Sequence, residues 1–397
     1  VGRSGGSAGG GLMGIPVGHM FRMSSIPPGK NSFELDGPRV KGTLDIRLRV
    51  VKRIHVNKIF DAILRGKAGG SPADIKMAWS MCNNYLNQTG NSNKAAKALQ
   101  KLEFFCVNEL FMTAQARYAD LVLPVTSAAE RSDLTMPWPS GPYFAFVNRA
   151  LEPLGECKSD LDIASELAER LGIKDFNPHT EEEWLKMLVE LNPEYQKHIK
   201  GYDEFKKNGI HRIKLPKPIV AFKEQIEDPE NHPFETPSGK IEIYSQRVAD
   251  LNNPLCPPIP KYMSTPEDRN DPLIEQYPLQ LLTPHAKNRV HSELYNVEWL
   301  REVEAHRAWI NPIDADPRGV GDGDEIYVFN DRGKVAIPAW VTERIIPGVI
   351  CIFEGAWYAP DENGIDRGAC ANTLTNDAYS DGGAAVMNSS LVQVQRA

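Results

Sequence analysis

The chain lacks several features that would assign it to a common class at once. It has no run of about 18 apolar residues, so no segment is typical of a membrane span. Its opening, VGRSGGSAGGG, has neither the basic start nor the apolar core of a secretory signal. The net charge is −7, which gives no support to nucleic-acid binding, since that function is usually carried by a basic face.

Paired cysteines are also missing. The six cysteines stand apart without a C-x-x-C pair, which argues against a zinc site or an iron–sulfur cluster built from them. No Ser/His/Asp, Cys/His or paired-carboxylate arrangement is visible. His285 and His291 are six residues apart on an expected loop or strand, a poor spacing for a metal pair. We therefore predict neither catalytic nor metal-binding residues in this chain.

What is present is ordinary globular composition organised around one stretch, Phe104–Asp133. With 397 residues, 41% hydrophobic and 24% charged, the chain should form two or more domains. Apolar runs at Phe104–Val107 and Leu121–Val125 flank a helix expected from Thr113. A further strand is expected at Ile75–Met81. The pattern predicts a parallel α/β sheet that is covered on both faces. Helices are expected over 53–67, 92–102 and 162–172.

Polar side chains follow two of these strands directly. Asn83 follows the strand at 75–81, and Asn108 and Glu109 follow the strand at 104–107. In parallel sheets ligands sit at the carboxyl ends of the strands. A carboxylate accepts hydrogen bonds only, so Glu109 suits a ligand edge with adjacent N–H donors, such as that of guanine. The alternative is that all three are solvated turn residues.

The second half of the chain changes character. Residues 174–230 are expected to form charged surface helices, and Phe234–Gln246 a β-hairpin with Pro-Ser-Gly turn chemistry. Residues 247–275, rich in Pro and Asn, indicate a linker. Short strands with turn motifs then predict a closed β-barrel, most clearly in Ala308–Gly333, AWINPIDADPRGVGDGDEIYVFNDRG.

These motifs carry a family resemblance. Polar–acid–x–x–x–Thr after an apolar strand, then Ala-Asp-(apolar)3-Pro and Glu130-Arg131, resembles the molybdopterin bis-guanine-dinucleotide oxidoreductases. Later segments are most similar to the dimethyl sulfoxide reductase branch. In that family the acid is more often Asp, where this chain has Glu109. The resemblance implies an α/β cofactor-binding region over 1–246, a linker over 247–276 and a double-psi β-barrel over 277–397.

The resemblance also implies which residues contact the cofactor. Arg131 could bind a pyrophosphate or form a surface ion pair, and Asp160 could contact guanosine while it or Ser159 caps a helix. Trp357 lies near the pterins or is a core aromatic at the barrel rim. The loop at 284–292 is dense in polar and cationic groups, although such a loop can be merely solvated. The expected contacts are Asn83, Asn108, Glu109, Arg131, Asp160, Thr283, His285, Lys287, Arg289, His291, Ser292, Trp357, Asn372 and Asn388.

The implied function is reduction of S-oxides or N-oxides by oxygen-atom transfer at molybdenum, held by two molybdopterin guanine dinucleotides. Implied partners are an iron–sulfur electron-transfer subunit and a membrane anchor subunit, on the periplasmic or cell-envelope side. The resemblance further implies that roughly the first half of the subunit precedes Val1, with a 4Fe-4S cluster and the metal ligand, so that this portion alone is inactive. Alternatives are a selenate, polysulfide or arsenic oxyanion reductase, a tungsten hydratase, or a non-catalytic cofactor-binding module.

Overall fold

A computed structural model describes residues 54–71, 73–135, 143–214, 222–380 and 384–397, and the glycine-rich opening lies outside them. The chain divides into two compact units. The first, called here the barrel unit, consists of Lys52–Leu123 and Ser245–Ala397. The second, called the insert unit, includes Pro124–Tyr244.

The α/β part of the barrel unit is built on a sheet of order β1-β2-β3. β1 and β2 are parallel, with Met77 opposite Phe104 and Met81 opposite Asn108. The predicted parallel sheet is therefore confirmed. Its core joins α2 and α4 to the buried face of β2. The elements are η2 (Val56–Lys58), α2 (Ile59–Arg65), η3 (Gly66–Gly69), β1 (Met77–Met81), α3 (Tyr85–Gln88), α4 (Ser92–Lys101), β2 (Phe104–Glu109), η4 (Ala116–Tyr118) and β3 (Leu121–Pro124).

The helix expected from Thr113 is wrong in length and type. Only a short 3-10 turn, η4, forms there. The Thr113 hydroxyl accepts from the amide of Ala116, and the Gln115 side chain donates to the carbonyl of Asn83 in the loop after β1. These side-chain bonds compete with regular helix formation.

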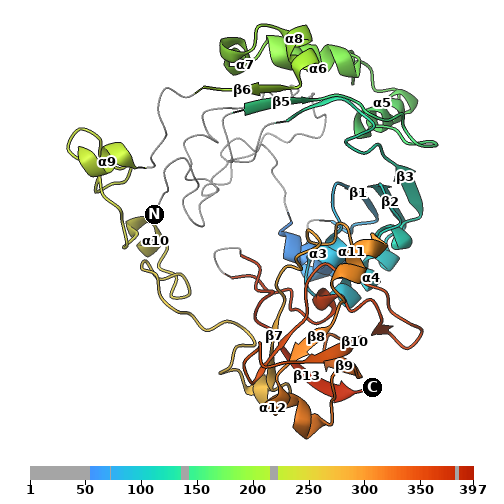
Figure 1. Ribbon diagram of the computed structural model, residues 1–397, viewed down its shortest axis with the longest axis vertical. Coiled ribbons are helices and arrows are strands. Elements are labelled where there is room, and N and C mark those ends of the chain that lie inside the picture. Colours follow the sequence, from blue (N-terminus) through green and yellow to red (C-terminus); the bar gives the residue numbers. More distant parts are fainter. Residues whose placement is uncertain (1–53, 72, 136–142, 215–221, 381–383) are drawn as a thin grey trace. The chain divides into compact units, whose positions relative to one another are not determined.

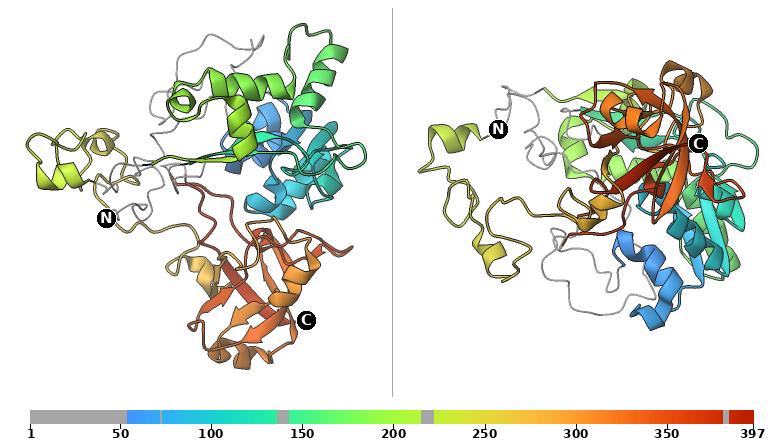
Figure 2. Two further views of the ribbon diagram at one scale, coloured as in Figure 1. Left: turned by 45° about the horizontal axis from the view of Figure 1, so that its top comes forward. Right: turned by 90° about the horizontal axis from the view of Figure 1, so that it is seen from below.

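The predicted barrel is confirmed as a closed ring of six strands with mixed direction (Figures 1 and 2). The ring runs β10-β8-β11-β7-β13-β9 and closes by β9 pairing with β10, while β12 is added outside on β10. Its interior is almost wholly aliphatic. The strands are β7 (Leu279–Leu282), β8 (Ala308–Ile310), β9 (Glu325–Asn330), β10 (Gly333–Val341), β11 (Val349–Cys351), β12 (Ile365–Asp366) and β13 (Leu391–Arg396).

Short helices decorate this barrel. α12 begins with Pro312 and is capped by the Asn311 side chain, which accepts from the amide of Ile313, as the Asn-Pro motif favours. The others in the barrel unit are α10 (Gln246–Ala249), η5 (Pro272–Glu275), α11 (Glu298–Val303), α12 (Pro312–Ala315), η6 (Asp316–Arg318) and η7 (Ala371–Thr373).

The insert unit has an antiparallel sheet of order β4-β5-β6 against several helices. The segment expected to form surface helices instead contributes much of a core, since Tyr195 is buried against Phe144 of β5 and Phe205 against Phe146. The elements are β4 (Asp133–Thr135), β5 (Tyr143–Val147), α5 (Asp160–Arg170), α6 (Glu181–Glu190), α7 (Pro193–His198), α8 (Tyr202–Asn208), β6 (Ile210–Arg212) and α9 (Lys223–Glu227).

The hairpin expected over Phe234–Gln246 is wrong. A turn does form, because the amide of Phe234 donates to the carbonyl of Gly239. No strand follows it, and Ile241 and Ile243 are 75% and 73% exposed. The alternating apolar pattern needs a partner strand to stabilise it, and none of the described residues supplies one here.

Candidate functional site

The carboxyl ends of β1 and β2 carry a network of uncharged side chains. The Trp79 indole N–H donates to Asn108 Oδ1 at 2.8 Å, and Ser80 Oγ donates to Asn83 Oδ1 at 2.8 Å. Gln115 Nε2 donates to Ser80 Oγ at 2.7 Å, which joins the loop after β2 to the end of β1. The prediction that both strand ends carry polar residues at one edge agrees with this register.

Glu109 folds back over its own loop. Its Oε1 accepts from the amide of Leu110 at 2.8 Å and its Oε2 from the hydroxyl of Thr113 at 3.3 Å. A carboxylate offers about four acceptor positions, so two remain for other donors. The next three side chains, Leu110, Phe111 and Met112, are 48–56% exposed, so the acid stands beside an uncovered apolar surface.

The barrel contributes the loop after β7. β7 and β11 are parallel, with Cys351 opposite Leu282. The ladder continues past the strands, since Glu354 N donates to Pro284 O at 3.0 Å. This register sets Glu354 beside His285, whose Nδ1 lies 2.7 Å from Glu354 Oε1. His291 Nδ1 lies 3.0 Å from the same oxygen.

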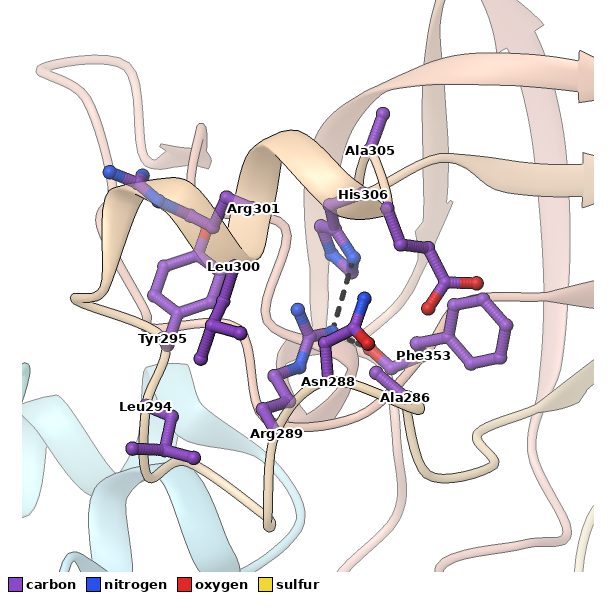
Figure 3. A pocket seen from close by; sticks show the side chains of 11 residues that line it. Ala286, Asn288, Arg289, Leu294, Tyr295, Leu300, Arg301, Ala305, His306 and Phe353 are labelled. Atoms are coloured by element: carbon purple, nitrogen blue, oxygen red, sulfur yellow. Dashed lines mark hydrogen bonds between the residues drawn. The ribbon is translucent and has the colours of Figure 1, made fainter.

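Arg289 braces this loop from within (Figure 3). Its Nε donates to the carbonyl of Glu354 at 2.9 Å, and its Nη2 lies 3.4 Å from the carbonyl of Phe353. The guanidinium also lies over the Tyr295 ring, 5.4 Å from the centroid. Burial lowers the pKa of the Arg289 guanidinium, while neighbouring acidic groups oppose that shift. Two of the guanidinium nitrogens of Arg289, which was predicted to bind the ligand, are thus hydrogen-bonded to the protein backbone.

His306 has one defined neutral tautomer. Its Nε2 is 3.0 Å from the carbonyl of Ala369, which can only accept, so Nε2 carries the proton. Its Nδ1 is then the acceptor for Arg289 Nη2 at 3.3 Å, the contact dashed in Figure 3. Burial lowers the pKa of His306 to about 4, because the charged imidazolium is disfavoured there.

The two parts of the barrel unit meet through amide side chains. Asn84 Nδ2 donates to Ser292 Oγ at 3.2 Å, and Asn87 Nδ2 donates to the carbonyl of Ala356 at 2.6 Å. Asn372 Nδ2 donates in turn to the carbonyl of Asn87 at 2.6 Å. The Trp357 indole donates to the carbonyl of Ser292 at 2.8 Å. Of the predicted cofactor contacts, Ser292, Trp357 and Asn372 therefore lie together at this junction, beside Asn84 and Asn87.

Two buried acceptors at this junction lack a hydrogen-bond partner among the described residues. These are Oδ1 of Asn84 and Oδ1 of Asn87, in side chains 6% and 5% exposed. A buried amide oxygen left unbonded destabilises a fold by about 1–3 kcal/mol. Such orphan acceptors suit a ligand with N–H donors, so this junction fits a pterin or a nucleotide base.

The remaining predicted residues are spread more widely. Thr283 donates to Asn388 Oδ1 at 3.1 Å on the barrel, and Lys287 is exposed. In the insert unit, Arg131 Nη2 lies 3.6 Å from Asp133 and its buried Nε has no described partner.

Helix α5 begins at Asp160, and the side chain of Ser159, the residue before it, accepts from the amide of Asp162. Ser159 is thus the N-cap, as one of the two predicted options.

Sequence reasoning missed four residues of this site: Asn84, Asn87, His306 and Glu354. Only one signal could have identified Glu354, namely its place just before Gly355. That glycine has a φ of 92°, and a Cβ there would lie 1.7 Å from the carbonyl oxygen of His291. A glycine is needed for the turn to approach His291 this closely.

Comparison with known proteins agrees with this geometry. Residues 60–170 match the family described as Molybdopterin oxidoreductase, and residues 279–389 match the Molydopterin dinucleotide binding domain. The chain is 40% identical over 322 residues to dimethyl sulfoxide reductase DmsA of Escherichia coli, which covers 77% of this chain and 40% of that protein. It is 35% identical over 324 residues to the dimethyl sulfoxide/trimethylamine N-oxide reductase of Cereibacter sphaeroides, covering 77% of this chain and 39% of that protein.

A solved structure shares the fold. Acetylene hydratase from Pelobacter acetylenicus aligns with a TM-score of 0.68 and 23% identity, over 86% of this chain and 46% of that one. Barrel, parallel sheet and family matches together define a molybdopterin-binding chain. It belongs to the molybdopterin oxidoreductase family. It spans about 40% of the length of the curated relatives named above.

Proposed function

We propose that this chain anchors a bis-molybdopterin guanine dinucleotide in the catalytic subunit of an S-oxide or N-oxide reductase. The observation that carries the proposal is the junction of Asn84 and Asn87, because their buried side-chain oxygens accept no hydrogen bond from the part of the chain that the structure describes. Residues 60–170, which include both, match the Molybdopterin oxidoreductase family. The named relatives at 35–40% identity include reductases of dimethyl sulfoxide and trimethylamine N-oxide, which supports that substrate class.

Guanosine is bound through acceptors and an apolar surface. The two unused acceptor positions of Glu109 receive N–H donors of a guanine edge, and the exposed Phe111 and Met112 cover one face of the base. Asn83 and Asn108 hold the strand ends around it. Arg131, through its unpartnered Nε, and Asp160 contact a second polar portion of a nucleotide.

Pterin and phosphate contacts come from the barrel and the junction. Exposed Lys287, His285 and His291 offer donors to phosphate oxygens. Ser292 and Asn372 hold pterin edges together with Asn84 and Asn87, and Trp357 packs beside them. Thr283 and Asn388, already bonded to each other, border the same loop. Bound molybdenum would supply the oxygen-atom transfer, while these residues orient its ligands and exclude water.

The wider arrangement follows from this role. We propose cofactor binding by residues 1–246, a linker at 247–276 and the dinucleotide-binding barrel at 277–397. A 4Fe-4S cluster upstream, an electron-transfer subunit and a membrane anchor subunit would complete the electron path on the periplasmic or cell-envelope side. No helix among the described residues is both long and apolar enough to cross a bilayer.

The proposal is tested by elemental and nucleotide analysis of the full subunit. Molybdenum is measured by mass spectrometry and guanine by chromatography after acid hydrolysis. We expect two guanines per metal in the unchanged protein and a clear loss in Glu109→Ala. Glu103→Ala is the matched control, because Glu103 precedes the other end of β2 and pairs with Lys76 at 2.7 Å. A metal- and pterin-free native protein would reject the proposal, and tungsten in place of molybdenum would favour a hydratase.

A further inference from the structure

One segment of the insert unit exposes an apolar face that no described residue covers. Residues 240–244 read KIEIY, and the side chains of Ile241 and Ile243 are 75% and 73% exposed. We propose that this segment forms a β-strand against a sheet edge in the part of the full subunit that lies outside these 397 residues. The proposal depends on the family to which the chain belongs, and not on the proposed cofactor contacts.

The segment has the side-chain pattern of a strand with one buried face. In an extended chain alternate side chains point to opposite sides, so Ile241 and Ile243 share one face, and Lys240, Glu242 and Tyr244 share the other. Isoleucine favours strands because its branched side chain packs well on a pleated surface. An apolar face opposite a polar one is typical of a strand in a sheet with solvent on one side. The two isoleucines therefore need a partner that covers them.

The backbone of this segment is also available for pairing. Within the described residues, the amides and carbonyls of residues 241–244 make no hydrogen bond. The turn before them is fixed, since the amide of Phe234 donates to the carbonyl of Gly239 at 3.0 Å and the hydroxyl of Thr236 donates to the carbonyl of Lys240 at 2.6 Å. The chain is thus anchored as far as Lys240 and then presents four residues whose donors and acceptors can pair with another strand.

The relatives indicate where the partner strand lies. The reductase of Escherichia coli and the acetylene hydratase are matched over only 40% and 46% of their own lengths. More than half of each therefore has no counterpart in this chain, and a sheet in that part can supply the edge. A second copy of this chain is a weaker partner, because a five-residue strand buries far less than the roughly 800 Å² per partner of a stable interface. A partner strand in the same polypeptide is held at high effective concentration.

Hydrogen–deuterium exchange read by mass spectrometry tests the pairing directly. The amides of residues 241–244 are followed in the 397-residue chain and in the full subunit. We expect exchange in the full subunit to be at least about tenfold slower, because a paired amide exchanges only when the strand opens. Equally fast exchange in both forms would overturn the proposal. So would slow exchange in the dilute 397-residue chain, which would show that the chain covers the segment itself, or slowing only at high concentration, which would indicate a second copy.

A substitution tests which face is covered. Ile243→Asp should leave the thermal midpoint of the 397-residue chain unchanged, because the side chain is exposed there, and should restore fast exchange at residues 241–244 in the full subunit. Slow exchange in β10 verifies that the variant subunit is folded. Ile226→Asp is the matched control, since Ile226 of α9 is 69% exposed and lies outside the segment, so exchange at 241–244 should stay slow.

Two results with these variants would reject the proposal. The first is slow exchange at residues 241–244 in the Ile243→Asp full subunit. The second is an equal gain of exchange there in Ile226→Asp, which would show a general loosening of the insert unit. Neither result depends on molybdenum or guanine content, so failure of this proposal is distinguishable from failure of the proposed function.

Discussion

Two regions of the barrel unit carry polar side chains in different environments. The amide junction of Asn84, Asn87 and Asn372 is buried and uncharged, and it connects the α/β part to the barrel. The loop of His285, His291 and Glu354 is charged and partly exposed. Neutral amides can be buried when they are bonded, whereas charges lose much more solvation. This difference indicates that the junction fixes the position of the α/β part on the barrel, whereas the loop supplies charged groups.

The largest effect should come from Asp366, whose carboxylate is fully buried although it is charged, which is an exception to this division. It accepts four hydrogen bonds, from the amides of Ala359, Gly368 and Cys370 and the hydroxyl of Thr373. Asp366→Asn sets an N–H₂ group against these donors, so we expect about 3 kcal/mol lower unfolding free energy. Chemical denaturation measures it. A change near that of Glu362→Gln, at an exposed carboxylate, would contradict this account.

The junction should be the next most sensitive region. Asn87→Ala removes the side-chain bonds from Asn87 Nδ2 to the carbonyl of Ala356 and to Cys370 Sγ. We expect a loss of about 2 kcal/mol, measured by the same denaturation. Lys287→Ala, in the exposed loop, should change unfolding by less than about 0.5 kcal/mol. Equal losses would remove the distinction between the two regions.

The pH dependence of stability should report on His306, which lies between the regions. Burial lowers its pKa to about 4 from the ordinary 6.5, so between those values the unfolded chain binds one more proton. The unfolding free energy therefore falls as pH is lowered from 6.5 to 4, by at most about 1.4 kcal/mol per unit, and is unaffected above it. His306→Gln should flatten this slope, and the exposed His232→Gln should not. An unchanged slope in His306→Gln would show that another group titrates.

The variants Arg289→Ala and Glu109→Ala should differ in stability, by less than the effects above. Arg289→Ala removes hydrogen bonds to the carbonyls of Glu354 and Phe353, so it should lower the unfolding free energy by about 1–2 kcal/mol. It should also lower the amount of cofactor that the protein retains. Glu109→Ala should lower retention with little change in stability, because its bonds are local to an exposed turn. Thermal unfolding beside metal content distinguishes them. Full cofactor occupancy in Arg289→Ala would show that Arg289 stabilises the fold and does not bind the cofactor.

Local pattern was sufficient to predict much of the fold. The apolar runs of β1 and β2 are determined by nearby residues, and so is the capping of α5 by Ser159. The strand expected after Gly239 failed because a strand needs a distant partner. Glu354 and Asn87 were missed for a similar reason: their roles depend on register between segments far apart in the chain.

The central claim is that the unpartnered acceptors at the junction bind the cofactor. It is tested most directly by guanine and molybdenum content in Asn84→Ala. The matched control is Asn93→Ala, since Asn93 also joins the two parts but has both polar atoms bonded, to Arg332 and Tyr358. The account predicts that Asn84→Ala loses most of its cofactor while Asn93→Ala retains it at similar stability. Equal retention in the two variants would contradict it.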